Sequence, residues 1–512
     1  MARISKSKGL NNSEKLLARL GERNFLGLWS WPNVQFCRSG KPPKEVADLL
    51  VVCGNHVIIF SDKHIEYPDT GDESLDWKRW YRRAIKSSAK QVEKAKRYIS
   101  QPNRLYLDAK GEAPLPTDLP ASNEMIIHGV VVARGVAKRC IQHFNSGYGS
   151  LMICPSVKGD DHLIPGKGKA DIFVIGDVNP EGPFVHVLDD GCLDIVLSEL
   201  NTITDLVKYL SEKEVFIRSG ILDSASGEED LVAYYMNNMK PDGGHGFVPP
   251  DGRLFDLDHK VSIQAGVWDE YAALPERVAK LRADRASSLW DKLITDFAEN
   301  ILNDTTVDLG VEMDFSDHER ALRYMALEPR YMRRSLGESI YNSLNSIKAD
   351  ERLGRTIVPA PDSRHHETAY VFFQMPYPGG DVSYDDYRKS RVMHLHAYGI
   401  SAYLEHKHLR RVIGIATEPL KLLDKPGSSE DLVFFEPDGR TPELEEEAAE
   451  LRKALDLLKP NRVIESRVDV DEFPKVPEPI EVNFEFPVEQ NTMNRKEKRK
   501  IKARLRRQRR SR

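Results

Sequence analysis

Two short apolar runs near the N-terminus predict a β-hairpin. Residues 45–53 read EVADLLVVC, residues 56–63 read HVIIFSDK, and Gly54-Asn55 stands between them. A two-residue loop of this kind fixes the register, so that Asp48 is expected opposite Ser61. Because side chains alternate between the two faces of a strand, Lys63 shares the face of Asp48 and Ser61, whereas Asp62 points away. The pattern therefore brings a carboxylate, a hydroxyl and an ammonium group to one face at the edge of a buried strand pair.

Helical periodicity flanks this hairpin on both sides. Before it, residues 11–13 (NNS) offer N-caps and leucines at helical spacing follow, so we expect Glu14 in the first turn of a short amphipathic helix. After it, residues 77–99 repeat apolar side chains every three or four positions, which predicts a long amphipathic helix. Gln91 falls within the apolar stripe of that helix, where its amide needs a hydrogen-bond partner.

The remaining chain alternates strand-like and helical segments. Short apolar runs predict strands that extend the first sheet or belong to a second domain, at 125–133, 150–154, 170–175 and 184–187. Apolar spacing of three and four residues predicts helices at 193–210, 274–302, 317–325 and 330–347. Strands at 370–374 and 412–416 are expected on either side of a helix at 384–406.

These patterns indicate an α/β (α+β) protein built from five segments. Residues 1–107 form an N-terminal core and residues 108–268 its α/β extension or a second domain. A mainly helical region, a small α+β module, and an extended arm with a basic tail follow at 269–350, 351–460 and 461–512.

The polar residues of the hairpin match the requirements of phosphodiester hydrolysis, which needs a carboxylate to hold a divalent metal and a cation to position the attacking water. Glu45-x-x-Asp48 followed by Ser61-Asp62-Lys63 resembles the motif of the PD-(D/E)xK nuclease superfamily, and more narrowly its nuclease-related domain (NERD) branch. Ser61 departs from the motif, since the family has an acid there. The resemblance covers roughly the first hundred residues.

The resemblance implies a restriction-endonuclease-like mixed sheet flanked by helices and a Mg²⁺- or Mn²⁺-dependent nuclease in prokaryotic defence against foreign nucleic acid. DNA is the expected substrate, and RNA is the alternative. It makes Asp48 a metal ligand, Lys63 the residue that orients the nucleophile, and Glu14 and Glu45 candidate further ligands. Ser61 and Gln91 complete the expected site. Because Ser61 removes one carboxylate, a catalytically inactive nuclease fold that binds nucleic acid or serves as a scaffold is the alternative.

Charge is distributed unevenly along the chain. The net charge is −5, but residues 494–512 hold twelve Lys or Arg and one Glu, so this tail carries +11 and the remainder −16. Such a block offers a grip on phosphate backbones without sequence preference. We expect nucleic-acid binding by the tail residues Lys498, Arg499, Lys500, Arg506 and Arg507. A solubility function of the tail is the competing interpretation.

Composition favours a cytoplasmic protein. The five cysteines form no C-x-x-C pair, which is typical of free thiols in a reducing compartment, and no apolar stretch is long enough for a membrane helix. A third interpretation is an adaptor, in which the helical region at 269–350 binds a protein partner or a second copy of the chain.

Other polar clusters are expected to have structural roles. His245 lies in a glycine-rich loop and is expected to face solvent. The basic cluster at Arg330, Tyr331, Arg333 and Arg334 is interpreted as a solvated helix face, with phosphate binding as the alternative. His394, His396, His406 and His408 are expected to be exposed or hydrogen-bonded, because a helix separates the members of each pair too widely for a shared metal.

Overall fold

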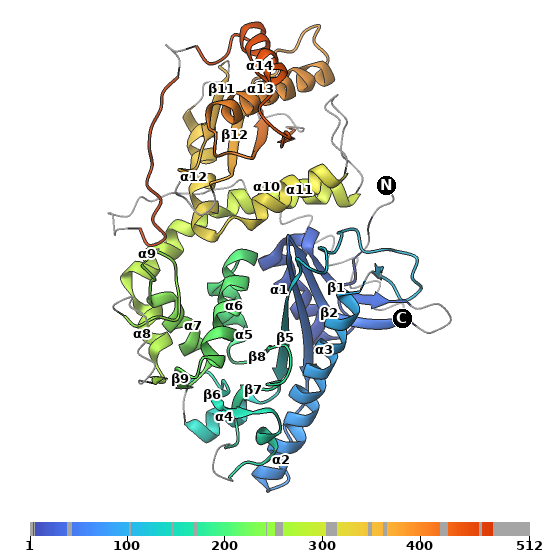
Figure 1. Ribbon diagram of the computed structural model, residues 1–512, viewed down its shortest axis with the longest axis vertical. Coiled ribbons are helices and arrows are strands. Elements are labelled where there is room, and N and C mark those ends of the chain that lie inside the picture. Colours follow the sequence, from blue (N-terminus) through green and yellow to red (C-terminus); the bar gives the residue numbers. More distant parts are fainter. Residues whose placement is uncertain are drawn as a thin grey trace, which may run out of the picture. The chain divides into compact units, whose positions relative to one another are not determined.

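Three sheets and the helices packed on them make up the described part of the chain (Figure 1). The structure, a computed structural model, describes residue 4 and residues 6–37, 43–101, 104–145, 147–166, 171–241, 243–250, 260–303, 315–346, 351–361, 366–419, 429–459 and 463–474. The predicted basic tail, with Lys498, Arg499, Lys500, Arg506 and Arg507, lies outside these residues, as does most of the predicted extended arm. Among the described helices, none is long and apolar enough to cross a membrane.

The first sheet has six strands in the order β4-β1-β2-β3-β5-β8. These strands are β1 (Ser30–Phe36), β2 (Lys44–Cys53), β3 (His56–His64), β4 (Leu105–Tyr106), β5 (Ile126–Arg134) and β8 (Val185–Asp189). Neighbours from β4 to β3 are antiparallel, and β3, β5 and β8 are parallel, so the sheet is mixed as expected. β5 and β8 come from the segment after residue 107, so part of that segment extends the first sheet.

The hairpin of β2 and β3 has the predicted register. Leu49 pairs with Phe60, and the ladder continues to Cys53 and His56 around the Gly54-Asn55 turn. Gly54 has a φ of 58°, a conformation that costs little only for a residue without a side chain. The apolar residues of both strands are buried on both faces, as expected for a central strand pair covered by helices.

Helices cover both faces of this sheet. On one face, α1 (Asn12–Trp29) places Phe25 5.9 Å from Phe60, measured between ring centroids. On the other lies a continuous helical segment made of α2 (Glu73–Tyr81), a π-helical turn (Arg82–Lys86) and α3 (Ser87–Ile99). Gly129 of β5 lets α3 approach closely, because a Cβ there would lie 2.3 Å from Val92 Cγ1. Both helices were predicted, although α1 is longer than expected.

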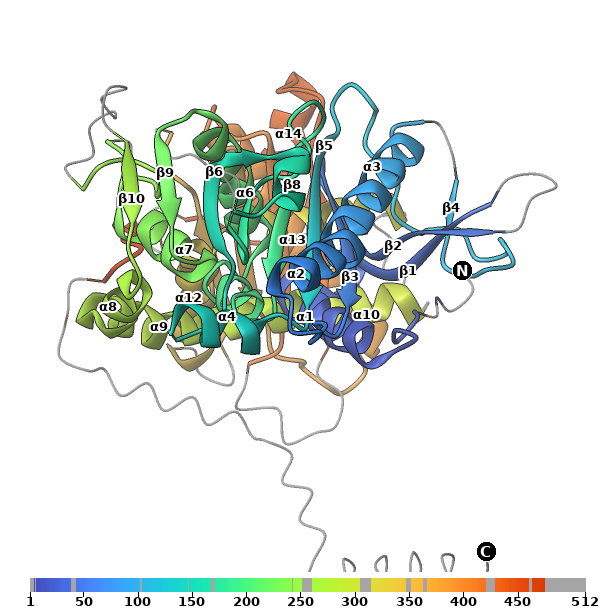
Figure 2. The same ribbon diagram turned by 90° about the horizontal axis from the view of Figure 1, so that it is seen from below.

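A second, four-stranded sheet follows in the order β10-β9-β6-β7, and Figure 2 shows β10, β9 and β6 next to one another. Its strands are β6 (Met152–Lys158), β7 (Val174–Asp177), β9 (Leu222–Ala225) and β10 (Val261–Ile263). The helices of this region are α4 (Ala137–Phe144), α5 (Leu193–Glu199), α6 (Ile203–Arg218) and α7 (Glu228–Asn237). The strands predicted at 150–154 and 170–175 thus belong here and begin later than expected.

Further helices follow the second sheet, and a third, four-stranded sheet with its own helices lies in the segment of the predicted α+β module. The helices are α8 (Val267–Ala273), α9 (Pro275–Ala283), α10 (Ser287–Asn303), α11 (Phe315–Leu327) and α12 (Arg330–Ser346). The module contains β11 (Leu353–Ile357), β12 (Thr368–Gln374), α13 (Tyr384–Glu405), β13 (Arg411–Thr417), β14 (Asp431–Phe435) and α14 (Pro442–Ala454). α13 connects the parallel strands β12 and β13. Trp290 of α10 packs edge-on against Tyr370 of β12, so the two regions share a core.

The arginines of α12 do not form a solvated helix face, so that interpretation was wrong. Arg330, Arg333 and Arg334 are all buried, and Arg333 is only 1% exposed. Arg330 and Arg333 both contact Asp291 of α10, at 2.5 and 2.7 Å. Arg334 pairs with Asp284 at 3.1 Å. These aspartates lie 39 to 50 residues earlier in the chain, so the local charge pattern could not reveal them, and the arginines are not free to bind phosphate.

Two histidines of α13 are hydrogen-bonded as expected, whereas His245 is not exposed to solvent as expected. His394 and His396 lie on α13, where His394 Nδ1 contacts the Ser390 carbonyl at 2.7 Å and His396 Nε2 contacts Glu447 at 3.0 Å. This agrees with the expected hydrogen-bonded histidines. His245, which was expected to face solvent, is buried, with Nε2 2.9 Å from a carboxylate oxygen of Glu472. That partner also comes from a distant segment.

Glu328 makes stability depend on pH in a predictable direction. The side chain is buried between α11 and α12, accepts a 2.8 Å hydrogen bond from the Tyr370 hydroxyl, and burial raises its pKa to about 7. Since the folded protein binds this proton more tightly than the unfolded chain, stability falls as the pH rises from about 4.5 to about 7. Glu328→Gln is therefore expected to raise the free energy of unfolding at pH 8 by about 3 kcal/mol, with the gain shrinking toward pH 4.5.

Urea denaturation of the wild type and Glu328→Gln at both pH values measures this difference. Glu299→Gln is the matched control, because Glu299 is exposed on α10 and its replacement should change little at either pH. An equal effect of Glu328→Gln at pH 4.5 and pH 8 would contradict the assignment of a buried, proton-binding carboxyl.

Candidate functional site

Asp48 is held by the main chain of the neighbouring strand. Its Oδ2 accepts a 2.6 Å hydrogen bond from the backbone N–H of Asp62. The side chain is half-buried, and burial raises its pKa to about 6 against the opposing effect of that hydrogen bond. The charges of Glu45 and Glu14 raise the pKa of Asp48 further, whereas Lys63 lowers it. Asp48 thus lies in a field to which all three of these predicted site residues contribute.

Lys63 lies within electrostatic reach of Asp48 but is not tied to it. The side chain is half-buried near the end of β3, and its positive charge favours the ionised form of Asp48. Among the described residues, no hydrogen bond or ion pair joins Lys63 Nζ to a carboxylate. An ammonium group that is partly desolvated and not neutralised by a direct ion pair can interact with an incoming anion.

Ser61 and Gln91 contact each other across the interface between β3 and α3. Ser61 Oγ donates a 3.2 Å hydrogen bond to Gln91 Oε1, so the amide has the partner that was expected of it. Ser61 is buried, but Gln91 is exposed at the edge of the apolar stripe rather than inside it, which corrects the sequence prediction. Ser61 therefore offers a hydroxyl and no charge at this point of β3.

Glu14 and Glu45 are joined by Asn33, a residue that the sequence analysis did not single out. Asn33 Nδ2 donates to Glu14 Oε2 at 3.1 Å and to Glu45 Oε1 at 2.8 Å. Asn33 has a φ of 54° next to an irregularity in β1, and asparagine adopts this left-handed conformation more readily than most residues. The Pro32-Asn33 pair was the available signal, since both residues are unusual inside a strand.

Glu14 and Glu45 differ in how many hydrogen bonds their carboxylate oxygens accept. Glu14 Oε2 also accepts from the Leu10 backbone N–H at 2.7 Å, and Glu14 Oε1 accepts from the Asn11 side chain. Asn11 in turn caps α1 through the N–H of Glu14. Glu14 is therefore part of a helix cap, as favoured at a helix N-terminus. Glu45 is exposed and keeps its Oε2 without a hydrogen bond to any described residue.

Asp62 points away from this group, as predicted from the strand alternation. Its carboxylate accepts from Arg134 Nε at 3.0 Å and from Arg134 Nη2 at 3.1 Å, in a buried pair with β5. The bidentate pair joins the end of β3 to β5.

The donor set suits a hard cation of the Mg²⁺ class. Carboxylate oxygens are its preferred protein ligands, and such sites commonly use one or two carboxylates with water and substrate phosphate. Asp48 Oδ1 and Glu45 Oε2 accept no hydrogen bond from any described residue, so both can bind such a cation. Glu14, in contrast, is engaged in the helix cap. In the described part of the chain, no group of three or more His, Cys, Asp or Glu side chains is arranged to hold a metal ion by itself.

All five cysteines lie in the described part and are free thiols, as expected, and none belongs to this group.

Comparisons of the chain with protein-family models, with curated proteins and with solved structures found no match. A function for this site is therefore argued from its geometry alone.

Proposed function

We propose that the edge of the first sheet is the active site of a metal-dependent nuclease that cleaves DNA in preference to RNA with Mg²⁺ or Mn²⁺. The observation that supports this proposal is the convergence of Asp48 and Lys63 from adjacent strands, with Glu45 and Glu14 close enough to raise the pKa of Asp48. Concentrated carboxylate charge next to an ammonium group suits a phosphodiester, which needs both a metal site and a cation.

Each residue has a defined task in this proposal. Asp48 and Glu45 would hold the metal, and Glu14 would add negative charge from the cap of α1. Lys63 would orient the attacking water and stabilise charge on the phosphate, and Gln91 would fix Ser61 beside them. A bound divalent cation would supply an activated water and neutralise the developing charge. The setting that fits best is cytoplasmic prokaryotic defence against foreign DNA, as the motif resemblance implies.

Cleavage of supercoiled plasmid tests the proposal. The full chain with Mg²⁺ or Mn²⁺ is expected to convert supercoiled DNA to nicked and linear forms, and an excess of chelator should abolish the conversion. Single-stranded RNA of matched length should be cut more slowly. If neither metal supports any cleavage of DNA or RNA, the nuclease proposal fails.

A nuclease fold that binds nucleic acid without cutting it is the second candidate. The specific observation that favours it is the buried Ser61 hydroxyl, which contacts Gln91 and provides no charge for a metal. This candidate predicts salt-sensitive DNA binding with no metal-dependent cleavage. A chain that neither cuts nor binds nucleic acid would point to an adaptor that binds proteins through the helical region.

Removal of residues 494–512 tests the proposed contribution of the tail to binding. The deletion takes away twelve cationic side chains and one Glu. Affinity for duplex DNA is expected to fall at low salt, and the plot of log affinity against log salt should become flatter by about 0.9 for each phosphate that the shortened chain no longer neutralises. Fluorescence anisotropy with a labelled duplex measures both. An unchanged slope would show that the tail does not contact the phosphate backbone.

A further inference from the structure

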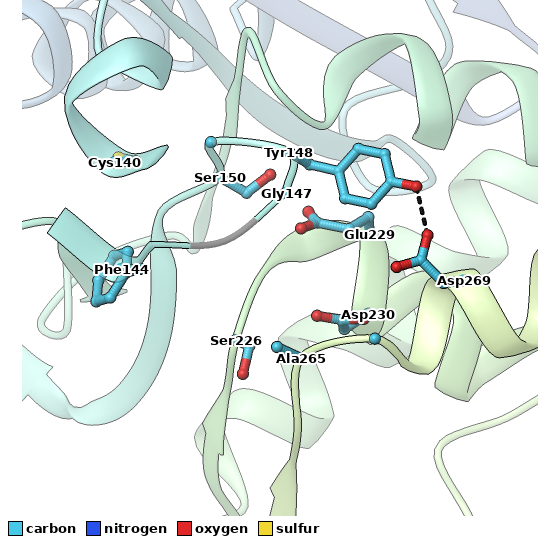
Figure 3. Close-up of a pocket in the computed structure, with 12 residues that line it drawn as sticks. Cys140, Phe144, Gly147, Tyr148, Ser150, Ser226, Glu229, Asp230, Ala265 and Asp269 are labelled. Carbon is cyan, nitrogen blue, oxygen red and sulfur yellow. Dashed lines mark hydrogen bonds between the residues drawn. The ribbon is translucent and has the colours of Figure 1, made fainter. Parts of the chain in front are cut away.

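A cavity of about 260 Å³ lies beside the second sheet and shares no lining residue with the site around Asp48 (Figure 3). Its wall combines α4, the loop that leads to β6, and the first turns of α7 and α8. The polar side chains of the lining are Tyr148, Ser150, Ser226, Glu229, Asp230 and Asp269. None of the described residues that line it is a lysine, arginine or histidine, so the wall carries negative charge without a counter-charge.

Glu229 is the unusual member of this wall. It lies in the first turn of α7, is only 6% exposed, and its Oε2 is buried without a hydrogen-bond partner among the described residues. Figure 3 shows its carboxylate directed toward Ser150, whose buried Oγ also completes no hydrogen bond within the described part. Buried polar atoms of this kind are costly unless a ligand or water satisfies them.

The ionisation of Glu229 also responds to its surroundings. Burial raises the pKa of Glu229 to about 7, the nearby Ser150 hydroxyl and the backbone N–H of Glu229 oppose this rise, and the charges of Asp189 and Asp230 add to it. The Ser150 hydroxyl thus influences the carboxylate although it is not placed for a well-formed hydrogen bond. A neighbouring cation would favour the charged carboxylate, since opposite charges at short range stabilise each other.

The other acids of the cavity are partly satisfied by the protein itself. Asp230 Oδ1 accepts a 2.9 Å hydrogen bond from the Trp268 backbone N–H at the start of α8. Asp269 Oδ1 accepts a 2.6 Å hydrogen bond from the Tyr148 hydroxyl, which is drawn in Figure 3. The ring of Tyr148 and that of Phe144 line the same cavity and offer faces that attract a cation or cover an alkyl chain.

We propose that this cavity binds a small ligand with an ammonium or guanidinium group and that Glu229 is its ion-pair partner. Such a group donates several hydrogen bonds and can therefore satisfy both Glu229 Oε2 and Ser150 Oγ. The cavity volume suits a compound of a few carbon atoms rather than a large cofactor. A metal ion fits this cavity less well, because the described residues contain no group of three or more His, Cys, Asp or Glu side chains that could hold one.

Isothermal titration of the full chain with putrescine and with agmatine tests this assignment. At least one of these amines is expected to bind with one molecule per chain, whereas 1,4-butanediol, which is similar in length to putrescine but neutral, should not bind. Glu229→Gln keeps the shape of the side chain, removes its charge, and should weaken amine binding at least tenfold. Glu270→Gln is the matched control, because this exposed residue of α8 lies next to Asp269 but does not line the cavity.

Asp269→Asn provides a second variant that is safe for folding, since Asp269 is exposed. It should also weaken amine binding, and thermal denaturation of each variant should show that the fold is retained. Three results would each overturn the proposal: no binding of either amine at millimolar concentration, equal binding of the diol, or unchanged binding by Glu229→Gln. Saturable Mg²⁺ binding that displaces the amine and depends on Glu229 would also overturn it, in favour of a metal site.

Discussion

Arg333→Met is expected to lower the free energy of unfolding by about 3–5 kcal/mol, the usual cost of removing one partner from a buried ion pair. Arg333 is almost fully buried, and its guanidinium donates to Asp291 Oδ1 at 2.7 Å, to the Glu328 carbonyl at 2.9 Å and to the Ala326 carbonyl. Methionine keeps much of the apolar volume, so the loss should come mainly from the polar groups left without a donor.

The pKa of Asp291 shows how strongly this aspartate depends on its arginines. Burial by itself would raise its pKa, but Arg333 and Arg330 outweigh burial and hold it below the usual range. Without Arg333, Asp291 keeps only Arg330 as a cationic contact among the described residues. The carboxylate, which is only half-buried, would then be poorly compensated, which adds to the expected instability.

Urea denaturation followed by circular dichroism measures the effect of Arg333→Met. Lys292→Met is the matched control, because Lys292 is the neighbour of Asp291 on α10 and forms an exposed pair with Asp296 at 2.7 Å. Loss of this pair should cost less than about 1 kcal/mol. Similar small losses in both variants would contradict the structural role assigned to Arg333.

Lys63→Met is expected to reduce the rate of metal-dependent DNA cleavage at least 100-fold. The loss of one preorganised charge at a reacting centre typically costs about 10²–10³ in rate. Asp48→Asn should have an effect of similar size, because it removes a proposed metal ligand while the amide oxygen can still accept the hydrogen bond from Asp62. Both variants should retain DNA binding, since neither touches the basic tail.

Initial rates of plasmid nicking at saturating Mg²⁺ measure these losses. Lys90→Met serves as the control, because Lys90 is exposed on α3 beside Gln91 and its replacement removes the same charge from a neighbouring surface. Cleavage at the wild-type rate by Lys63→Met would rule out the proposed site even if the protein cuts DNA. Loss of cleavage by Lys90→Met as well would indicate impaired binding rather than impaired chemistry.

The hairpin and the long helix were predictable because their determinants are local. The Gly54-Asn55 turn sets the β2–β3 register, and strand alternation then separates Asp62 from Asp48, Ser61 and Lys63. Likewise, the three- and four-residue spacing in 77–99 predicts a continuous helical segment, although not the π-helical turn at Arg82–Lys86. The strand register and the helical segment both follow from residues that lie only a few positions apart in the sequence.

The unpredicted features depend on partners far apart in the chain. Asn33 joins Glu14 to Glu45, and β1, which contains it, escaped notice because Pro32 and Asn33 interrupt an ordinary strand pattern. Arg333 resembled a surface residue because its partner Asp291 belongs to another helix. Tertiary contacts of this kind override the local preference for solvent. The cavity around Glu229 is assembled from three separate stretches of the chain and leaves no local signature.

The attachment of Asp48 to a main-chain N–H has a consequence for how this region can change over evolutionary time. Every residue except proline provides that donor, so exchanges at position 62 can leave the anchor of Asp48 in place. Such exchanges act instead through the contact with Arg134. A substitution at position 62 therefore acts on the junction of β3 with β5, while the main-chain hydrogen bond to Asp48 can persist.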